Sequence, residues 1–179
     1  MNKQSDDMAL AKAAASGNRG AFEELLALHY QTIYKIAFQW CGNQADAQDI
    51  TQNACIKLAR AINSFRGDAK FTSWLYQLVI NTAKDWQRQQ SAISRKHIYD
   101  TQADIAIKPD IDEPIYAQQV MLKVYHLPER EKEALLLVAS GGLSHLEAAM
   151  LIGCQESTIS WRIHEARKKL NTLFGGGKK

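Results

Sequence analysis

Apolar residues in the first half of the chain recur every three or four positions, which is the spacing of amphipathic helices. The pair Gly42-Asn43 separates the first predicted helix from the second, and the turn-rich residues 63–68 separate the second from a third that starts near Thr72. The inward positions of these three helices are Phe22, Leu25, Leu26, Ile33, Ala37 and Phe38, then Ile50, Ala54, Leu58, Ala61 and Ile62, then Leu75, Leu78, Val79, Thr82 and Trp86. No proline precedes Pro109, which favours consecutive helices over a turn-rich β protein.

The helical spacing is lost over residues 91–115, which hold several aspartates and two prolines. We interpret this segment as an extended acidic linker. A last helical block runs from about Val120 to about Phe174, and the glycine- and lysine-rich end of the chain is too polar and flexible to fold. The pattern predicts an all-α protein with two small helical domains over residues 1–92 and 117–174, a flexible linker over 93–116 and a disordered tail over 175–179.

The sharpest local pattern lies in the last block. Ser144 and Glu147 fit a capping box, in which each side chain bonds the backbone N–H of the other at a helix start. Gly153 suits a tight turn, and a second helix is expected from about Glu156. The predicted inner faces are Leu146, Ala149 and Met150 or Leu151 in the first helix, and Ile159, Ile163, Ala166 and Leu170 in the second.

Two short helices joined at a glycine form a helix-turn-helix pattern, whose second helix would enter the major groove of DNA. Its predicted outer face offers Ser157, Thr158, Ser160, Trp161, Arg162 and Glu165. The spacing also fits an ordinary pair of helices with a solvated charged face. Short hydroxyl side chains at the start of the second helix favour DNA, because they let a helix N-terminus approach phosphates closely.

Aromatic and basic residues are interleaved around the predicted loop of the first block. They are Phe65, Phe71, Trp74, Tyr76 and Trp86, with Arg66, Lys70, Lys84 and Arg88. Burial in the core is the default interpretation for aromatics at helical spacing, and Trp86 fits it. Around a loop, however, such residues also suit unpaired bases, because rings stack on bases while cations hold the backbone. Asn81 adds an amide that can hydrogen-bond a base edge.

Composition narrows the function classes. The formal net charge is only +3, and the three cysteines are too far apart for a C-x-x-C pair, so neither a disulfide framework nor a zinc site is predicted. No nucleophile–base pair or glycine-rich phosphate loop suggests an enzyme, and no cofactor is expected. The chain has neither a secretory leader nor an apolar run long enough for a bilayer, so we expect a cytoplasmic protein without membrane insertion.

Four segments in order resemble the extracytoplasmic-function (ECF, group IV) sigma factors of bacterial RNA polymerase, over about residues 8–173. An opening helix segment is followed by counterparts of region 2.2, regions 2.3 and 2.4, and region 4. The segments are Gly17-Asn18-Arg19-Gly20-Ala21-Phe22-Glu23-Glu24-Leu25; Asp46-Ala47-Gln48-Asp49-Ile50-Thr51-Gln52-Asn53; Ser64-Phe65-Arg66-Gly67-Asp68 with Phe71, Trp74-Leu75-Tyr76 and Asn81-Thr82-Ala83-Lys84; and Leu127-Pro128-Glu129-Arg130-Glu131 through Leu170.

The resemblance implies a sigma factor that directs core RNA polymerase to promoters and helps to open the −10 element. It implies contact with the β′ clamp through Asp46, Asp49 and Gln52, and contact of the chain with the β flap. It implies −35 recognition by Ser157, Thr158, Ser160, Trp161, Arg162, Arg167 and Lys168, and −10 recognition by Phe65, Arg66, Gly67, Asp68, Lys70, Trp74, Asn81, Lys84 and Arg88. An anti-sigma factor is a further implied partner. The alternatives are a free-standing helix-turn-helix regulator and a helical adaptor without DNA contact.

The chain departs from the family pattern at several positions. Gln48 and Asn53 stand where the family usually has acids, which removes two negative charges from the docking face. Thr51 lies between the remaining acids and this gap, so we hypothesise that its phosphorylation would restore the charge. In the recognition helix, Trp161 replaces a small residue, and Ser160 and Glu165 replace residues that are often basic.

Overall fold

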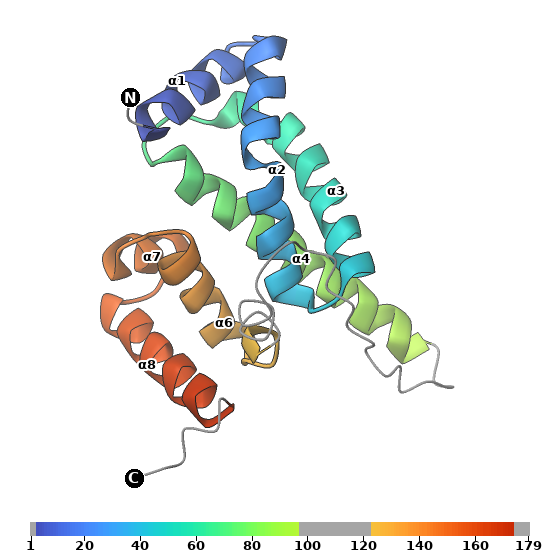
Figure 1. The fold of residues 1–179 in the computed structure, drawn as a ribbon, viewed down its shortest axis with the longest axis vertical. Helices are drawn as coiled ribbons and strands as arrows, with labels where there is room; N and C mark the ends of the chain where they lie inside the picture. Colours follow the sequence, from blue (N-terminus) through green and yellow to red (C-terminus); the bar gives the residue numbers. More distant parts are fainter. Residues whose placement is uncertain (1–2, 97–122, 174–179) are drawn as a thin grey trace. The chain divides into compact units, whose positions relative to one another are not determined.

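A computed structural model describes residues 3–96 and 123–173 of the chain, and all its regular structure is helical in these residues, as the sequence predicts. The described residues form two compact units, one before and one after the undescribed stretch of the sequence (Figure 1). The helices are α1 (Lys3–Ala15), α2 (Arg19–Cys41), α3 (Gln44–Ala61), η1 (Ile62–Ser64), α4 (Phe71–Lys96), α6 (Glu129–Leu135), η2 (Leu136–Ser140), α7 (His145–Ile152) and α8 (Glu156–Leu173).

Only one of the predicted domain boundaries, the one after residue 92, falls within the residues that the structure describes. Helix α4 continues to Lys96, beyond the predicted end of the first domain at residue 92. Residues 97–116 of the predicted linker and the whole predicted tail lie outside the described residues.

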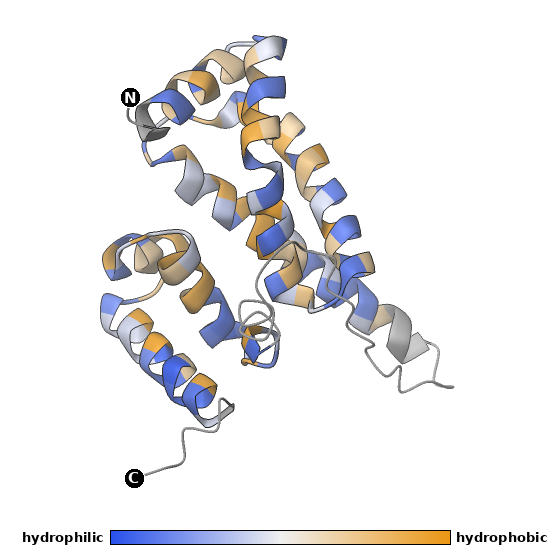
Figure 2. Ribbon diagram, in the orientation of Figure 1, coloured by the Kyte–Doolittle hydropathy of each residue, from blue (hydrophilic) through white to orange (hydrophobic). Residues whose placement is uncertain are grey.

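The first unit is a bundle in which α2 packs against α1, α3 and α4. Blue and orange segments alternate along α2 and α3 in Figure 2, as expected for helices with one buried face. Most of the predicted apolar stripe is buried, with Leu25, Ile33, Ile50, Leu58 and Val79 fully enclosed. Five of the predicted inward residues are only half-buried, namely Phe22, Leu26, Ala61, Leu78 and Trp86.

The ends of α2 and α3 explain why the chain turns where the sequence predicts. Asn18 caps α2, because its Oδ1 accepts from the backbone N–H of Ala21 at 3.1 Å. Gly42 then adopts a φ of 79° after the last turn of α2, and Asn43 caps α3 by accepting from the N–H of Asp46 at 2.9 Å. The Gly42-Asn43 pair is therefore one helix stop followed at once by one helix start.

Helix α1 was not among the helices that the apolar spacing predicts, since its alanine-rich sequence carries no apolar stripe. It docks through Ala11 and Ala14, which are buried, and through a buried pair of polar side chains. Asp7 Oδ1 lies 3.2 Å from His29 Nε2 on α2, and the His29 ring lies 5.3 Å from the ring of Phe71 on α4. These contacts join three helices at one point of the core.

The second unit is built from α6, its π-helical continuation η2, α7 and α8. Helix α8 packs against both α6 and α7, and Ile159, Ile163 and Ala166 point inward as predicted. Lys169 Nζ on α8 donates to Glu131 Oε1 on α6 at 2.7 Å, and the Glu131 side chain is almost fully buried. This ion pair ties the two ends of the unit's sequence together.

The predicted inner face of α7 is confirmed at Ala149 and wrong at Leu146 and Met150. Ala148 and Ala149 are the residues that pack inward, whereas Leu146 is 55% exposed and Met150 is 75% exposed. The helix has only eight residues, so its apolar positions do not define a face, and small alanines allow α7 to approach α8 closely. The capping box is present as expected, with Ser144 and Glu147 bonding each other's backbone N–H groups.

Candidate nucleic-acid interface

The predicted docking residues lie on the outward side of α3. Asp49 and Gln52 are exposed, and Asp46 is half-buried in the first turn. The Asn43 side chain donates to the Asp46 carboxylate, so Asp46 is held in place by the same residue that caps the helix. Gln48 and Asn53 are exposed on this helix as well. The two positions that lack the expected acids are therefore part of the accessible surface.

Thr51 does not share that surface, and the premise of the phosphorylation hypothesis is wrong. Its exposure is only 1%, and its hydroxyl donates to the Ala47 carbonyl oxygen at 2.7 Å. Thr51 lies one turn after Ala47 and three residues before Ala54, both fully buried. It belongs to the core stripe of α3, and the folded unit offers no accessible hydroxyl at this position.

The loop after η1 presents polar residues above an aromatic core. Arg66, Asp68 and Lys70 are exposed, whereas Phe65 is only 8% exposed. The Phe65 ring packs edge-on against Phe71 at 5.7 Å and lies 5.3 Å from the ring of the half-buried Trp74. The prediction that Phe65 stacks on a base is not met by this arrangement, because neighbouring rings cover it.

Gly67 shapes the exposed part of this loop. It has a φ of 80°, a conformation that residues with a side chain rarely adopt. A Cβ atom at Gly67 would also meet Lys12 Cε of α1 at 3.0 Å. Helix α1 therefore brings Lys12 to the loop, a basic residue that the sequence interpretation did not include. Its signal was weak, since Lys12 lies more than fifty residues earlier in a helix without an apolar stripe.

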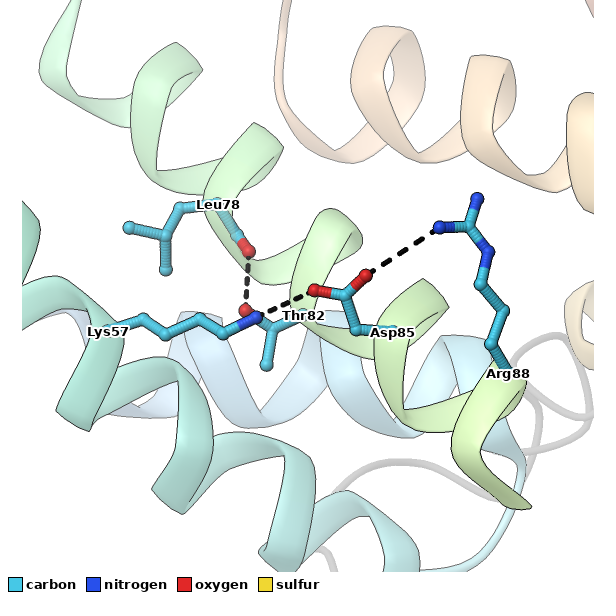
Figure 3. Close-up of polar contacts among 5 residues, drawn as sticks. All are labelled: Lys57, Leu78, Thr82, Asp85 and Arg88. Atoms are coloured by element: carbon cyan, nitrogen blue, oxygen red, sulfur yellow. Dashed lines mark hydrogen bonds and ion pairs between the residues drawn. The ribbon is translucent and has the colours of Figure 1, made fainter. Parts of the chain in front are cut away.

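The exposed side of α4 carries the remaining predicted residues of this surface. Asn81 and Arg88 are exposed and Lys84 is half-buried. Asp85 lies between Lys57 of α3 and Arg88, as Figure 3 shows, at 2.8 Å from Lys57 Nζ and 3.7 Å from Arg88 Nη1. The sequence interpretation missed Lys57, which the packing of α3 against α4 brings to Asp85. One carboxylate thus partly neutralises two cations at this surface.

The outward side of α8 is the second candidate surface. Ser157, Trp161, Arg167 and Lys168 are exposed, with Thr158 half-buried. Arg162 is also half-buried, and its Nη1 atom is enclosed without a hydrogen-bond partner. Its guanidinium is therefore partly withdrawn from the surface on which we predicted it.

Ser160 on the same helix makes contacts within the unit. Its hydroxyl lies 2.9 Å from His145 Nδ1 of α7 and donates to the Glu156 carbonyl oxygen at 3.2 Å. Ser160 thereby links the start of α7 to α8, close to the surface that it was expected to present to DNA.

Neither unit shows a metal centre or a membrane segment in the described ranges 3–96 and 123–173. No group of three or more candidate metal-binding side chains is found there, and Cys41, Cys55 and Cys154 are free thiols. No helix among these residues combines the length and hydropathy that crossing a bilayer requires.

Comparison with family models gives a match at each unit. The model of sigma-70 region 2 matches residues 25–93, and that of sigma-70 region 4 matches residues 117–170. The chain belongs to the sigma-70 family. The α3 surface, the polar loop and most of α4 fall inside the region 2 match, and α7 and most of α8 fall inside the region 4 match.

Relatives within this sigma-70 family align along nearly the whole chain. The chain is 30% identical to the RNA polymerase sigma-H factor of Pseudomonas aeruginosa, over 96% of this chain and 95% of that protein. It is 29% identical to the ECF RNA polymerase sigma-E factor of Escherichia coli K12, with the same coverage of each. These relatives identify it as an ECF member of the family.

Two solved structures share the fold. The sigma factor RpoE from Bartonella quintana, solved in complex with the anti-sigma factor NepR, matches with a TM-score of 0.75 and 22% identity, over 88% of this chain and 98% of that one. CnrH, solved in complex with the cytosolic domain of CnrY, matches with a TM-score of 0.70 and 24% identity, over 97% of this chain and 99% of that one. At these identities, the likeness concerns the fold.

Proposed function

We propose that this chain directs core RNA polymerase to specific promoters and helps to open the −10 element, as a subunit without catalytic chemistry of its own that acts in the cytoplasm. The observation that carries the proposal is the presence of region 2 and region 4 in one chain, in that order. Each unit also exposes a polar surface of the kind that its proposed partner requires.

The outward side of α3 is the proposed contact with the β′ clamp of the polymerase. Asp49 and Gln52 are accessible, and Asp46 is oriented by its capping partner. The uncharged Gln48 and Asn53 make this surface less acidic than the family pattern. Since each exposed ion pair contributes up to about 1 kcal/mol, docking should be weaker than with a full set of acids.

The polar loop and α4 are the proposed −10 surface. A flipped base costs a few kcal/mol, which new contacts must offset. With Phe65 covered, those contacts come from the exposed polar groups of residues 66–70, from Asn81, and from the accessible part of Trp74. Lys84 and Arg88 would hold the phosphates of the separated strand. The role of Phe65 in this proposal is to support the loop from below.

Helix α8 is the part of the second domain that we propose recognises the −35 element. The proposed bounds of this domain are residues 117–174. Ser157 and Thr158 lie in its first turn, where backbone N–H groups favour phosphates. Arg167 and Lys168 supply exposed positive charge nearer its other end. The same domain would contact the β flap. Because relatives of this fold have been solved with an anti-sigma factor or with CnrY, we include an anti-sigma factor among the partners.

Run-off transcription tests the proposal. The full chain is added to a purified bacterial core polymerase on a random promoter library, with core polymerase alone as the control. Promoter-specific transcripts that require the chain support a sigma factor. Binding to duplex DNA without polymerase, with no such transcripts, would instead identify a free-standing regulator, and the absence of both results would identify an adaptor.

The role of α4 has its own test. Asn81→Ala should lower formation of the open promoter complex, measured by permanganate footprinting, and leave the affinity for core polymerase unchanged. Gln31→Ala removes an exposed amide from α2 and is the matched control, which should open promoters normally. An Asn81→Ala protein that opens promoters like wild type would remove Asn81 from the proposed surface.

A further inference from the structure

Trp161 occupies an unusual place in the second unit. Its side chain is 60% exposed, although tryptophan is highly buried on average. Ile159, Ile163 and Ala166 form the buried side of α8, and Trp161 lies on the opposite side of the helix. The indole therefore stands near the middle of the surface that this helix presents outward.

Polar residues surround Trp161 on that surface. Ser157 lies one turn before it, His164 almost one turn after it and Lys168 two turns after it, and all three are exposed. The spacing places these residues in one row along the helix. Glu165, also one turn after Trp161, is half-buried. The exposed row around the indole thus carries hydroxyl, imidazole and ammonium groups, which suit a polyanion that also offers apolar groups.

The two sequence neighbours of Trp161, Ser160 and Arg162, offer few polar groups with which a base could hydrogen-bond. Ser160 is exposed, but its hydroxyl bonds Glu156 and His145, and the Arg162 guanidinium is partly enclosed. A base pair that faces this point would meet mainly the indole ring. In the major groove, the apolar group that a base edge offers is the C5-methyl group of thymine.

We propose that Trp161 reads thymine in the −35 element by apolar contact with its C5-methyl group, an inference that rests on the proposed function. Lys168, and Arg167 beside it, bind the flanking phosphates and fix the position of α8 in the groove. The contact favours thymine over cytosine because cytosine has no methyl group at C5. The indole takes the place of the direct base contacts that Ser160 and Arg162 were expected to make.

Deoxyuridine provides the test, because it pairs like thymidine and lacks only the methyl group. The holoenzyme selects promoters from a random duplex library, and each −35 thymidine is then replaced singly by deoxyuridine. At the position that Trp161 reads, the replacement should weaken holoenzyme binding about fourfold, the factor expected from one buried methyl group. Replacements at positions away from α8 should leave binding unchanged.

Variants assign this effect to the indole. Trp161→Ala should bind the thymidine and deoxyuridine promoters equally, and Trp161→Phe should keep part of the difference. Met150→Ala removes another exposed apolar side chain of the same unit and should keep all of it. The affinity of Trp161→Ala for core polymerase without DNA should equal that of wild type.

Three results would overturn the inference while leaving the proposed function intact. One is a selected promoter at which no deoxyuridine replacement changes binding. A second is a Trp161→Ala holoenzyme that still discriminates between the two promoters. A third is weakened binding of Trp161→Ala to core polymerase in the absence of DNA, which would place the indole at a protein interface. Failure of the proposed function itself looks different, since the library would then yield no promoters.

Discussion

Replacing Thr51 by glutamate tests whether this side chain lies on the surface of α3 or in the core. At an accessible site, Thr51→Glu would imitate a phosphate and restore charge to the docking side of α3. The structure places the side chain in the core, where it is 1% exposed beside the fully buried Ala47 and Ala54. There the new carboxylate must lose its hydration, or else take up a proton.

The magnitude follows from that burial. An unpaired buried charge costs several kcal/mol, so Thr51→Glu should destabilise the first unit by about 3 to 5 kcal/mol. For a unit of this size, each kcal/mol lowers the melting temperature by about 4 to 8 °C, so the expected drop exceeds about 12 °C. Thr51→Val removes only a local hydroxyl bond to Ala47, whose carbonyl keeps its helical partner, and should cost about 1 kcal/mol.

Thermal unfolding of the full chain, followed by circular dichroism, measures these differences. Asn53→Glu is the matched control, because it adds the same charge at an exposed position of the same helix. It should change stability by less than about 0.5 kcal/mol and tighten binding to core polymerase, since it restores one of the missing acids. If Thr51→Glu melted within a few degrees of wild type and bound the polymerase more tightly, our account of α3 would be refuted.

Further predictions concern the second unit and the core of the first. Ser144→Ala removes the cap of α7 and should cost about 1 kcal/mol, seen as faster amide exchange in that helix. Lys169→Met leaves the buried Glu131 carboxylate unpaired and should cost about 1 to 3 kcal/mol in urea unfolding, a loss that adding Glu131→Gln should largely recover. Burial raises the pKa of Tyr76, so the folded state holds its phenol proton more tightly than the unfolded state. Stability should therefore fall as the pH rises above about 10, and fall less in Tyr76→Phe, as measured by urea unfolding at a series of alkaline pH values.

Long helices made the fold readable from the sequence. Helix α8 has 18 residues, about five turns, and Ile159, Ile163 and Ala166 define a single inward side along it. Helix α7 has only about two turns, which do not define a single inward side. Leu146 and Ala149 could face the core together, and so could Ala148 and Ala149. Alanine decided the outcome, because its small side chain permits the closer packing. In α1, alanines lie on all sides of the helix, so the sequence shows no apolar stripe from which the helix could be predicted.

Individual positions in the candidate site were harder to place than helices. Thr51 lies four residues after Ala47, so the spacing predicts a core position. Its place between the remaining acids and the gap left by the missing ones nevertheless suggested a surface role. Phe65 lies in a loop, where no period indicates which way a side chain points. The contact between Lys57 and Asp85 joins residues 28 apart on different helices and depends on how α3 packs against α4. Periodicity within one segment contains no information about such a pairing.

The position of Asp85 bears on why a protein of this kind would need a large partner in order to choose its DNA. Phosphate binding gains free energy by releasing counterions from DNA, so each cation that is already paired contributes less to it. Lys57 and Arg88 share the Asp85 carboxylate, and the whole chain has a formal net charge of only +3. Long-range attraction to DNA is therefore weak. In our proposals, selectivity comes from short-range groups, Asn81 in one unit and Trp161 in the other. We therefore expect these groups to act when the polymerase holds the chain at the promoter, because the low net charge supplies little affinity for DNA by itself.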